Sequence, residues 1–295
     1  MEGTEWKLPL LYVYRRQLAD SGGPGRWRGG LTAAAAVTPF GVGALVLNST
    51  NTAGTEPSNA HGIDGGYPGA GSQVRVLRGT DVWGRLKAGH IPLEDSDFGG
   101  DVEHLPSKAS GKLSANDVLV FFAPGGGGFG DPLDREPERV AADVASGWVS
   151  IARARQNYGV AIAPDGSADG AETQRAREAI LRARKEHPVL SWESDDRCAR
   201  PPAAGDEAWR VGENVELTPG GAGVLRCRRC GETLSGPQGR VAVSLRPLRE
   251  AGPWMALRYG GDGPNFLLEE VACAGCATLV SVREVRRDGS QVQDN

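Results

Sequence analysis

Four of the five cysteines in this chain stand in two pairs with the spacing C-x-x-C. The pairs are Cys227 with Cys230 and Cys273 with Cys276, and residues 231–272 separate them. A C-x-x-C turn presents two thiolates to one side of a metal ion, and Zn²⁺ takes four such soft ligands in a tetrahedron. The spacing therefore predicts one Zn²⁺ bound by all four thiolates. Because four protein ligands leave no position for water, we expect this zinc to be structural.

The residues around the two pairs favour a zinc ribbon. Each pair is followed by a small residue and a Thr-Leu run, in CGETL and CATLVSV, and the segments RVAVSLRPL and WMALRYG between the pairs suit further strands. With few large apolar side chains in this region, metal binding is expected to supply much of the folding free energy. Two alternatives stay open, namely redox dithiols or free cysteines, and an iron–sulfur centre. Cys198, alone in a linker, is expected to be a bystander.

A glycine-rich loop, PGGGGFGD, is the second feature that could bind a ligand. Glycines allow backbone N–H groups to point at an anion near a helix N-terminus. No Lys-Ser or Lys-Thr follows Gly130, as a Walker A loop requires, and the loop does not open a first βα unit, as the dinucleotide fingerprint requires. We expect a tight turn with close backbone packing. The alternative is contact with substrate or phosphate in an assembled complex, by Gly125, Gly126, Gly127 and Gly128.

The histidines do not form a recognisable catalytic set. There are only four, and none pairs with another at a metal-ligand spacing. His61 in HGIDGG and His90 in GHIPLEDSD sit on loops, where they could line a site, although surface roles are expected first. The chain contains neither G-x-S-x-G nor H-E-x-x-H. The catalytic residues therefore remain unknown, and no self-sufficient active site is expected.

Composition excludes several classes of protein. The formal net charge of -4 argues against a non-specific nucleic-acid binder. Glycine accounts for 43 of 295 residues, roughly twice its usual share, which favours a fold rich in strands and turns. No apolar run approaches the length that spans a bilayer, and the N-terminus does not resemble a signal peptide. We expect a cytoplasmic protein without membrane or nucleic-acid partners.

The helices and strands expected from the sequence pattern predict an α+β fold whose first part is rich in strands. Helices are expected over Pro137–Ser146 and Ile151–Tyr158, and a charged helix over 165–187. Gly147 and Gly159 are expected to end the first two helices, and Ser150 to cap the second. The predicted strands are Leu8–Tyr14, Ala33–Val37, Gly43–Leu47, Gln73–Leu77 and Asp117–Phe122.

The predicted elements and the composition divide the chain into four parts. They are a β-rich domain over 1–162, a helix and linker over 163–206, a zinc ribbon over 207–287 and a flexible tail over 288–295. The helix has only a narrow apolar stripe, so it is expected to be a connector or to lie on a partner.

Two regions resemble known families. DSGGPGRWRGGL and PGGGGFGDPL, together with GIDGGYPGA and LPSK, resemble the C-terminal half of the hydantoinase B / 5-oxoprolinase family, and the likeness extends over about 1–162. Residues 224–286, with LRCRRCGETL and the long run from WMALRYG to SVREV, are similar to the small zinc-bearing subunit of acetone carboxylase.

The combined resemblance implies a subunit of a multi-subunit, ATP-dependent, biotin-independent carboxylase of the acetone or acetophenone carboxylase type. Such an enzyme carboxylates a ketone or similar enolisable substrate with bicarbonate. The resemblance implies a hetero-oligomer in which partner subunits hold ATP and a catalytic divalent metal. One partner would be a hydantoinase A-like ATPase, and another would supply the N-terminal half of a hydantoinase B-like subunit.

Two rival functions stay open. One is a subunit of an ATP-dependent hydantoinase, oxoprolinase or lactamase that hydrolyses a cyclic amide. The other is a non-catalytic zinc-ribbon assembly subunit. The family's metal-site motifs, which resemble NDP…GGTH, are missing, and the match begins where the second half of the family proteins begins. We therefore expect a split-gene half or an accessory subunit that is inactive alone, and we transfer no catalytic residues.

Overall fold

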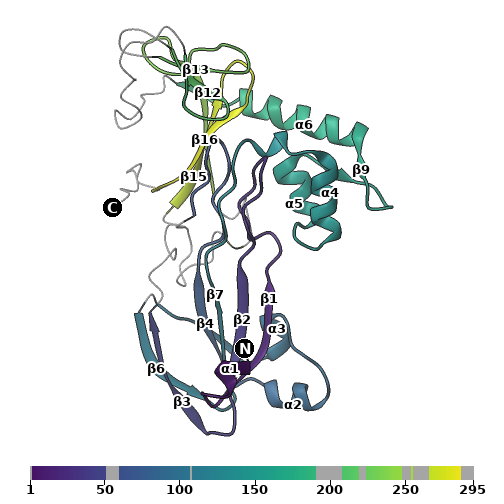
Figure 1. The fold of residues 1–295 in the computed structure, drawn as a ribbon, viewed down its shortest axis with the longest axis vertical. Coiled ribbons are helices and arrows are strands. Elements are labelled where there is room, and N and C mark those ends of the chain that lie inside the picture. Colours follow the sequence, from purple (N-terminus) through teal and green to yellow (C-terminus); the bar gives the residue numbers. More distant parts are fainter. Residues whose placement is uncertain are drawn as a thin grey trace.

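The computed structural model describes residues 2–50, 60–106, 108–190, 208–218, 224–247, 254 and 266–286. It is an elongated, strand-rich molecule (Figure 1). A five-stranded sheet lies at one end, and the cysteine-bearing strands with three helices lie at the other. Within the described ranges, no helix combines the length and the apolar character needed to cross a membrane.

The five-stranded sheet is antiparallel throughout. Its order is β1 (Leu10–Gln17), β2 (Ala33–Pro39), β7 (Val118–Phe122), β4 (Gln73–Arg78) and β5 (Asp101–His104). The short helices α2 (Val82–Lys87) and α3 (Asp95–Phe98) place Val82 and Phe98 in the core of the sheet, where both are fully buried. A separate pair of strands, β3 (Ala44–Thr50) and β6 (Lys108–Ser114), and the short α1 (Glu2–Glu5) complete this end.

The predicted strands and helices of the first part are confirmed. The five predicted strands correspond to β1, β2, β3, β4 and β7, with ends that differ by a few residues. Helices α4 (Pro137–Ala145) and α5 (Ile151–Tyr158) occupy the predicted ranges. The Ser150 hydroxyl accepts the N–H of Arg153, and Gly159 ends α5 in the left-handed region. Local capping chemistry is sufficient to define these ends.

The charged helix is shorter than predicted. Helix α6 covers Gly170–Lys185 and begins after Asp169, whose carboxylate accepts the N–H of Glu172. The preceding residues form a turn and the short strands β8 (Ala161–Ile162) and β9 (Ala168–Asp169) instead. The helix starts at the residue that can cap it, rather than at the first charged residue.

Three glycine-rich segments, 21–30, 60–70 and 124–130, lie side by side between the two ends of the molecule (Figure 1). They contain no ladder strands, yet backbone hydrogen bonds of 2.8–2.9 Å join them. These bonds include Gly23 N–H to Gly126 O, Gly126 N–H to Gly30 O, Gly128 N–H to Tyr67 O and Ala70 N–H to Ser21 O.

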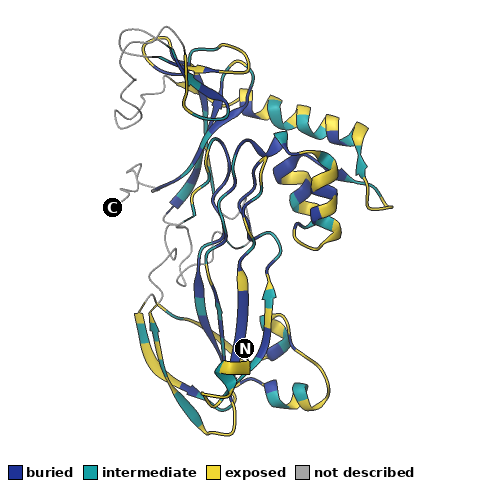
Figure 2. Ribbon diagram, viewed as in Figure 1, coloured by how far each residue is buried: buried dark blue, intermediate teal, exposed yellow. Residues whose placement is uncertain are grey.

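Glycine is required here because the backbones approach too closely for side chains. A Cβ added at Gly29 would lie 1.9 Å from the carbonyl oxygen of Gly126, and one at Gly66 would lie 2.1 Å from that of Gly128. Most of this layer is buried (Figure 2). The abundance of glycine in the chain therefore has a packing reason in these segments.

The cysteine-bearing end contains two further sheets and a short helical turn, η1 (Pro132–Asp134). The larger sheet has the order β10 (Val189–Leu190), β14 (Val241–Pro247), β15 (Phe266–Cys273) and β16 (Leu279–Arg286). The smaller has the order β11 (Trp209–Arg210), β12 (Val215–Leu217) and β13 (Leu225–Cys227).

The larger sheet packs directly on the glycine layer. Tyr67 shares a hydrophobic cluster with Leu268 and Leu279, which are both fully buried. Gly65 has no room for a side chain, because a Cβ there would lie 2.5 Å from the carbonyl oxygen of Leu279. The predicted domain boundaries stay a prediction. Cys198, the tail 288–295 and most of WMALRYG lie outside the described residues.

Candidate metal centre and adjoining cavity

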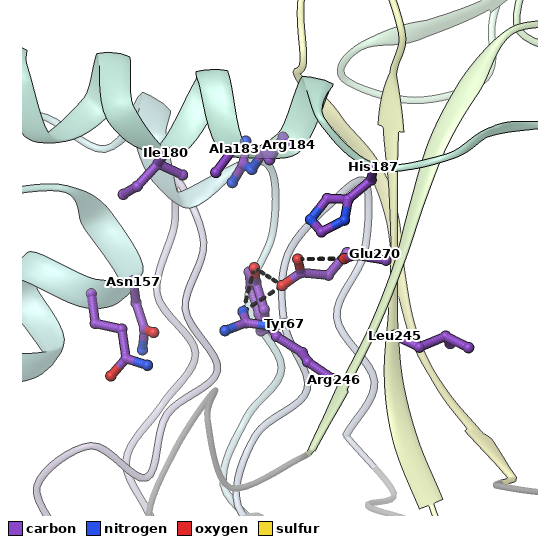
Figure 3. Close-up of a pocket in the computed structure, with 11 residues that line it drawn as sticks. Tyr67, Asn157, Ile180, Ala183, Arg184, His187, Leu245, Arg246 and Glu270 are labelled. Carbon is purple, nitrogen blue, oxygen red and sulfur yellow. Dashed lines mark hydrogen bonds and ion pairs between the residues drawn. The ribbon is translucent and has the colours of Figure 1, made fainter.

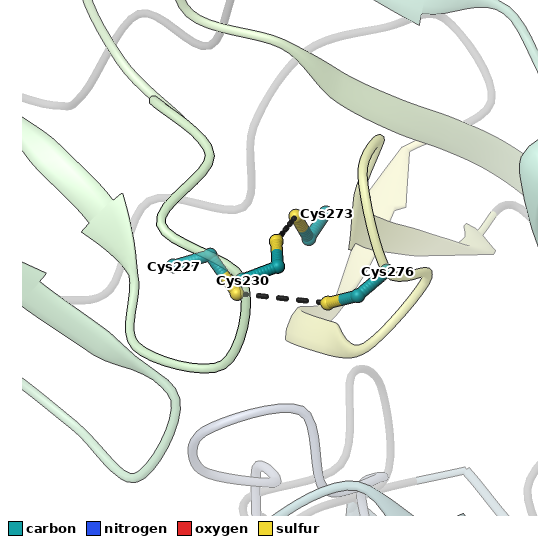
Figure 4. A group of neighbouring side chains, drawn as sticks. All are labelled: Cys227, Cys230, Cys273 and Cys276. Carbon is teal, nitrogen blue, oxygen red and sulfur yellow. Dashed lines mark hydrogen bonds between the residues drawn. The ribbon is translucent and has the colours of Figure 1, made fainter.

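The four paired cysteines converge on one point (Figure 4). Their sulfur atoms all lie within 4.8 Å of one another, and no disulfide joins them. Cys227 Sγ lies 3.7 Å from Cys276 Sγ, and Cys230 Sγ lies 3.5 Å from Cys273 Sγ. A tetrahedral zinc with Zn–S bonds of about 2.3 Å places its sulfurs about 3.8 Å apart. The geometry fits the predicted four-thiolate metal site.

The backbone of both turns is shaped to hold thiolates. The N–H groups of Arg229 and Cys230 donate to the sulfur of Cys227, and that of Cys276 donates to the sulfur of Cys273. Each turn is closed by a residue with positive φ, Gly231 at 78° and Ala277 at 61°. These are the small residues that follow each C-x-x-C pair. Glycine adopts this conformation freely, whereas the Cβ of Ala277 makes it unfavourable by about 1–2 kcal/mol.

The thiols of the second pair have opposite pKa shifts. Hydrogen bonding with the thiol of Cys227 raises the pKa of Cys273 and lowers that of Cys276. Neighbouring thiolates repel each other, so a bound divalent cation is what would allow all four to ionise together.

Both cysteine turns contact the end of the glycine loop. The guanidinium of Arg229, inside the first pair, forms an ion pair with Asp134 of η1. The N–H of Leu279, just after the second pair, donates to Asp131 Oδ2 at 2.9 Å. The GDPLD segment that follows the glycines therefore anchors the candidate metal centre to the first part of the chain.

Helix α6 reaches the same anchor through Arg184. Its guanidinium binds the Asp131 carboxylate through two nitrogens and also donates to the carbonyl of Ala277 at 3.1 Å. The side chains of Arg184 and Asp131 are 8% and 2% exposed, so this is a buried ion pair. In the last turn of α6, Arg184 is buried while Arg182, Ala183 and Lys185 are exposed, so this helix contributes one side chain to the interior. Whether it also acts as a connector or lies on a partner stays a prediction.

A cavity of about 340 Å³ lies beside this ion pair, between α5, α6, β14 and β15 (Figure 3). Tyr67, Arg246 and Glu270 form its hydrogen-bonded wall. Tyr67 donates to Glu270, Arg246 Nη2 donates to both Glu270 and the Tyr67 oxygen, and Ser244 donates to Glu270 Oε2 at 3.1 Å. Glu270 is 8% exposed and Tyr67 is 4% exposed.

Tyr67 is held in its neutral form. Burial, reinforced by the neighbouring Glu270 carboxylate, raises the pKa of Tyr67 well above its usual value. The phenol therefore acts as a hydrogen-bond donor to Glu270 at neutral pH. Its backbone belongs to the glycine layer, where its N–H donates to Pro24 and its carbonyl accepts from Gly128.

The glycine loop packs closely against neighbouring backbone, as the first of the two interpretations predicts. The N–H groups of Gly125, Gly126 and Gly128 donate to the carbonyls of Ala70, Gly30 and Tyr67. Backbone amides with such partners are not available to a phosphate. Whether Gly125, Gly126, Gly127 and Gly128 lie near a substrate in an assembled complex stays a prediction.

The two candidate histidines do not come together. His61 is exposed and lies against the glycine loop, since a Cβ at Gly127 would be 2.0 Å from its carbonyl oxygen. His90 is exposed and follows α2 at the far end of the five-stranded sheet, where its N–H donates to Arg85. A substrate-facing role for either histidine stays a prediction.

The sequence analysis missed the polar wall of the cavity and the buried ion pair. Their members lie far apart in the chain: the residue numbers of Tyr67 and Glu270 differ by 203, and those of Asp131 and Arg184 by 53. The one signal that could have indicated the ion pair is the Asp after Gly130 together with an Arg on the narrow apolar stripe of the helix.

The first part of the chain matches a known family. Residues 1–132 match the family described as Hydantoinase B/oxoprolinase. The resemblance inferred from DSGGPGRWRGGL and PGGGGFGDPL is confirmed.

Among curated proteins, the chain is 32% identical over 224 residues to the acetone carboxylase alpha subunit of Xanthobacter autotrophicus, covering 67% of this chain and 28% of that protein. It is 32% identical over 179 residues to the caprolactamase beta subunit of Pseudomonas jessenii, covering 61% and 28%. It is 28% identical over 199 residues to the acetophenone carboxylase delta subunit of Aromatoleum aromaticum, covering 64% and 29%.

The fold of this chain is similar to that of a chain in a solved structure of nucleotide-free acetone carboxylase, with a TM-score of 0.54 and 30% sequence identity. The match covers 62% of this chain and 26% of that chain. This chain therefore spans less than a third of the length of the relatives that it matches.

Proposed function

We propose that this chain is a subunit of a multi-subunit, ATP-dependent, biotin-independent carboxylase that joins bicarbonate to a ketone or similar enolisable substrate. The observation that carries the proposal is the extent of the match to the acetone carboxylase alpha subunit, 224 residues against 179 for the caprolactamase subunit at the same identity. The acetophenone carboxylase delta subunit, with 199 aligned residues, supports the same choice.

The matched relatives are named as alpha, beta and delta subunits, so the chain is proposed to act within a hetero-oligomer. The proposed compartment is the cytoplasm. The four cysteines would hold a structural Zn²⁺ in this chain. A hydantoinase A-like ATPase would bind ATP, and a chain supplying the N-terminal half of a hydantoinase B-like subunit would carry the catalytic divalent metal. With four thiolates as ligands, the zinc would have no position free for substrate.

The second candidate is a subunit of an ATP-dependent enzyme that hydrolyses a cyclic amide. The similarity to the caprolactamase beta subunit favours it, because the identity equals that to the acetone carboxylase subunit. Both candidates use ATP, but the hydrolase consumes water where the carboxylase consumes bicarbonate.

The experiment is to purify the tagged chain with its partners and to measure ATP turnover by the complex. For the carboxylase, we expect a ketone to stimulate ATP turnover only when bicarbonate is present, and ¹⁴C-bicarbonate to enter an acid-stable product. ATP turnover stimulated by a lactam or hydantoin without bicarbonate would instead establish the hydrolase. Full activity of the partners without this chain would identify it as an assembly subunit.

A further inference from the structure

The cavity beside the buried ion pair is a candidate ligand site that is separate from the four cysteines. Its volume of about 340 Å³ suits a small organic molecule. Helix α6 supplies Ile180 and Ala183 on one side, and β14 and β15 supply Arg246 and Glu270 on the other (Figure 3). The cavity therefore has an apolar wall facing a charged one.

Arg246 still has hydrogen-bonding capacity. Both of its contacts, to Glu270 and to the Tyr67 oxygen at 2.9 Å, use Nη2. Among the residues that the structure places, Nε has no acceptor and Nη1 makes no hydrogen bond. Figure 3 shows the guanidinium below Tyr67, with one nitrogen turned toward the side of the cavity where Asn157 lies. An anionic oxygen in the cavity would find this nitrogen already oriented.

The fixed charges around the cavity suit a single negative charge. Arg184 is paired with Asp131, which lies outside the cavity, and Glu270 is bound by three donors, so each buried carboxylate already has partners. One open guanidinium nitrogen matches a monocarboxylate better than a phosphate dianion, which needs several cationic donors. The side chains of Gln156 and Asn157 add amide groups on the α5 side.

We propose that this cavity binds a small monocarboxylate, with the carboxylate against Arg246 and a short apolar chain against Ile180 and Ala183. The wall formed by Tyr67, Glu270 and Ser244 holds the guanidinium in place before the ligand arrives. Preorganisation of this kind lowers the cost of binding. The site is independent of the proposed zinc and of the proposed reaction.

The test is calorimetric titration of the full chain with three probes: butyrate, butyramide and inorganic phosphate. Butyramide has nearly the shape of butyrate but no charge. We expect saturable binding of butyrate, and binding of butyramide and phosphate that is at least about tenfold weaker. Butyramide loses the charge-assisted hydrogen bond, and the charge of phosphate does not match the site. Equal binding of butyramide, tighter binding of phosphate, or no saturable binding of butyrate would each overturn the proposal.

Two variants locate the site. Arg246→Lys is expected to weaken butyrate binding about tenfold or more. Lysine has a single terminal nitrogen, so it lacks the second one that would contact the ligand while Nη2 stays bound to Glu270 and Tyr67. Ala183→Phe fills the cavity from an exposed position on α6 without touching the charged wall, so it keeps the test valid if Arg246→Lys fails to fold. Arg182→Lys, at an exposed position outside the cavity, is the matched control. Butyrate binding that survives both cavity variants would show that the ligand binds elsewhere.

Discussion

Arg184 and Asp131 form a buried, two-pronged ion pair, with Nη1 2.7 Å from Oδ2 and Nη2 3.2 Å from Oδ1. Asp131 also accepts the N–H groups of Leu133 and Leu279, and Arg184 also donates to Ala277. The pair thus joins the end of the glycine loop, the last turn of α6 and the second cysteine turn. Each charge is satisfied only while all three segments are in place.

Arg184→Leu is expected to destabilise the protein by about 3–5 kcal/mol, because it leaves the Asp131 carboxylate buried without its cation. Arg182→Leu, two residues away on the same helix and exposed, should change the free energy of unfolding by less than about 0.5 kcal/mol. Urea denaturation of both variants measures this difference. Similar stabilities of the two variants would mean that the ion pair is dispensable.

Cys273→Ser is expected to abolish metal binding and to unfold much of 207–287. The loss of one of four ligands weakens a structural zinc site severely. Cys227 and Cys273 are also members of the buried hydrophobic cluster of this region, so loss of the metal would disturb that cluster as well. The measured zinc content should fall from about one ion per chain to nearly none. Circular dichroism should show a loss of strand signal. Cys198→Ser is the matched control and should keep its zinc. Unchanged metal content in Cys273→Ser would refute the metal site.

Gly29→Ala is expected to destabilise the protein by about 3 kcal/mol or more, because its new methyl group would collide with the backbone of Gly126. Gly30 is a control in the same segment, since a Cβ there meets nothing within 4 Å. Gly30→Ala should be neutral or slightly stabilising, by up to about 1 kcal/mol. Thermal unfolding of the two variants compares them directly. A close similarity between them would show that the glycine layer can open at little cost.

Stability is expected to fall above about pH 10, where tyrosines ionise in the unfolded chain. Burial raises the pKa of both Tyr67 and Tyr158 in the folded protein, so the folded state keeps protons that the unfolded state loses. Each such tyrosine lowers the free energy of unfolding by up to about 1.4 kcal/mol per pH unit. Tyr67→Phe should therefore show a shallower decline between pH 9 and 11. An identical slope in the variant would indicate that Tyr67 titrates normally.

Local features were predictable because local chemistry determines them. Short apolar runs between turn clusters predicted four strands of the five-stranded sheet, β1, β2, β4 and β7, but not the exposed strand β5. Ser150 and Gly159 predicted both ends of α5. The cysteine spacing was sufficient to predict one four-thiolate cluster, because each pair is a turn and the geometry of a metal requires the two turns to meet.

For the glycine loop, the sequence pattern predicted a need for glycine but not the contacts that require it. Its composition indicated either anion binding or close packing, and both need glycine for the same conformational reason. Only the tertiary structure shows that the amides of Gly125, Gly126 and Gly128 donate to two neighbouring segments. Those segments lie far away in the chain, so no local pattern could distinguish the two interpretations.

The sequence by itself predicted five strands of the first part, the ends of α5, the four-cysteine cluster and the resemblance of the first segment to the hydantoinase B family. The tertiary structure alone decided that Tyr67 would contact Arg246 and Glu270, and that Arg184 of the charged helix α6 would be buried beside Asp131. Periodicity and capping act over a few residues, whereas a buried polar contact depends on which surfaces pack together. Packing is a property of the whole fold, and the cavity forms where α5, α6, β14 and β15 pack around Tyr67.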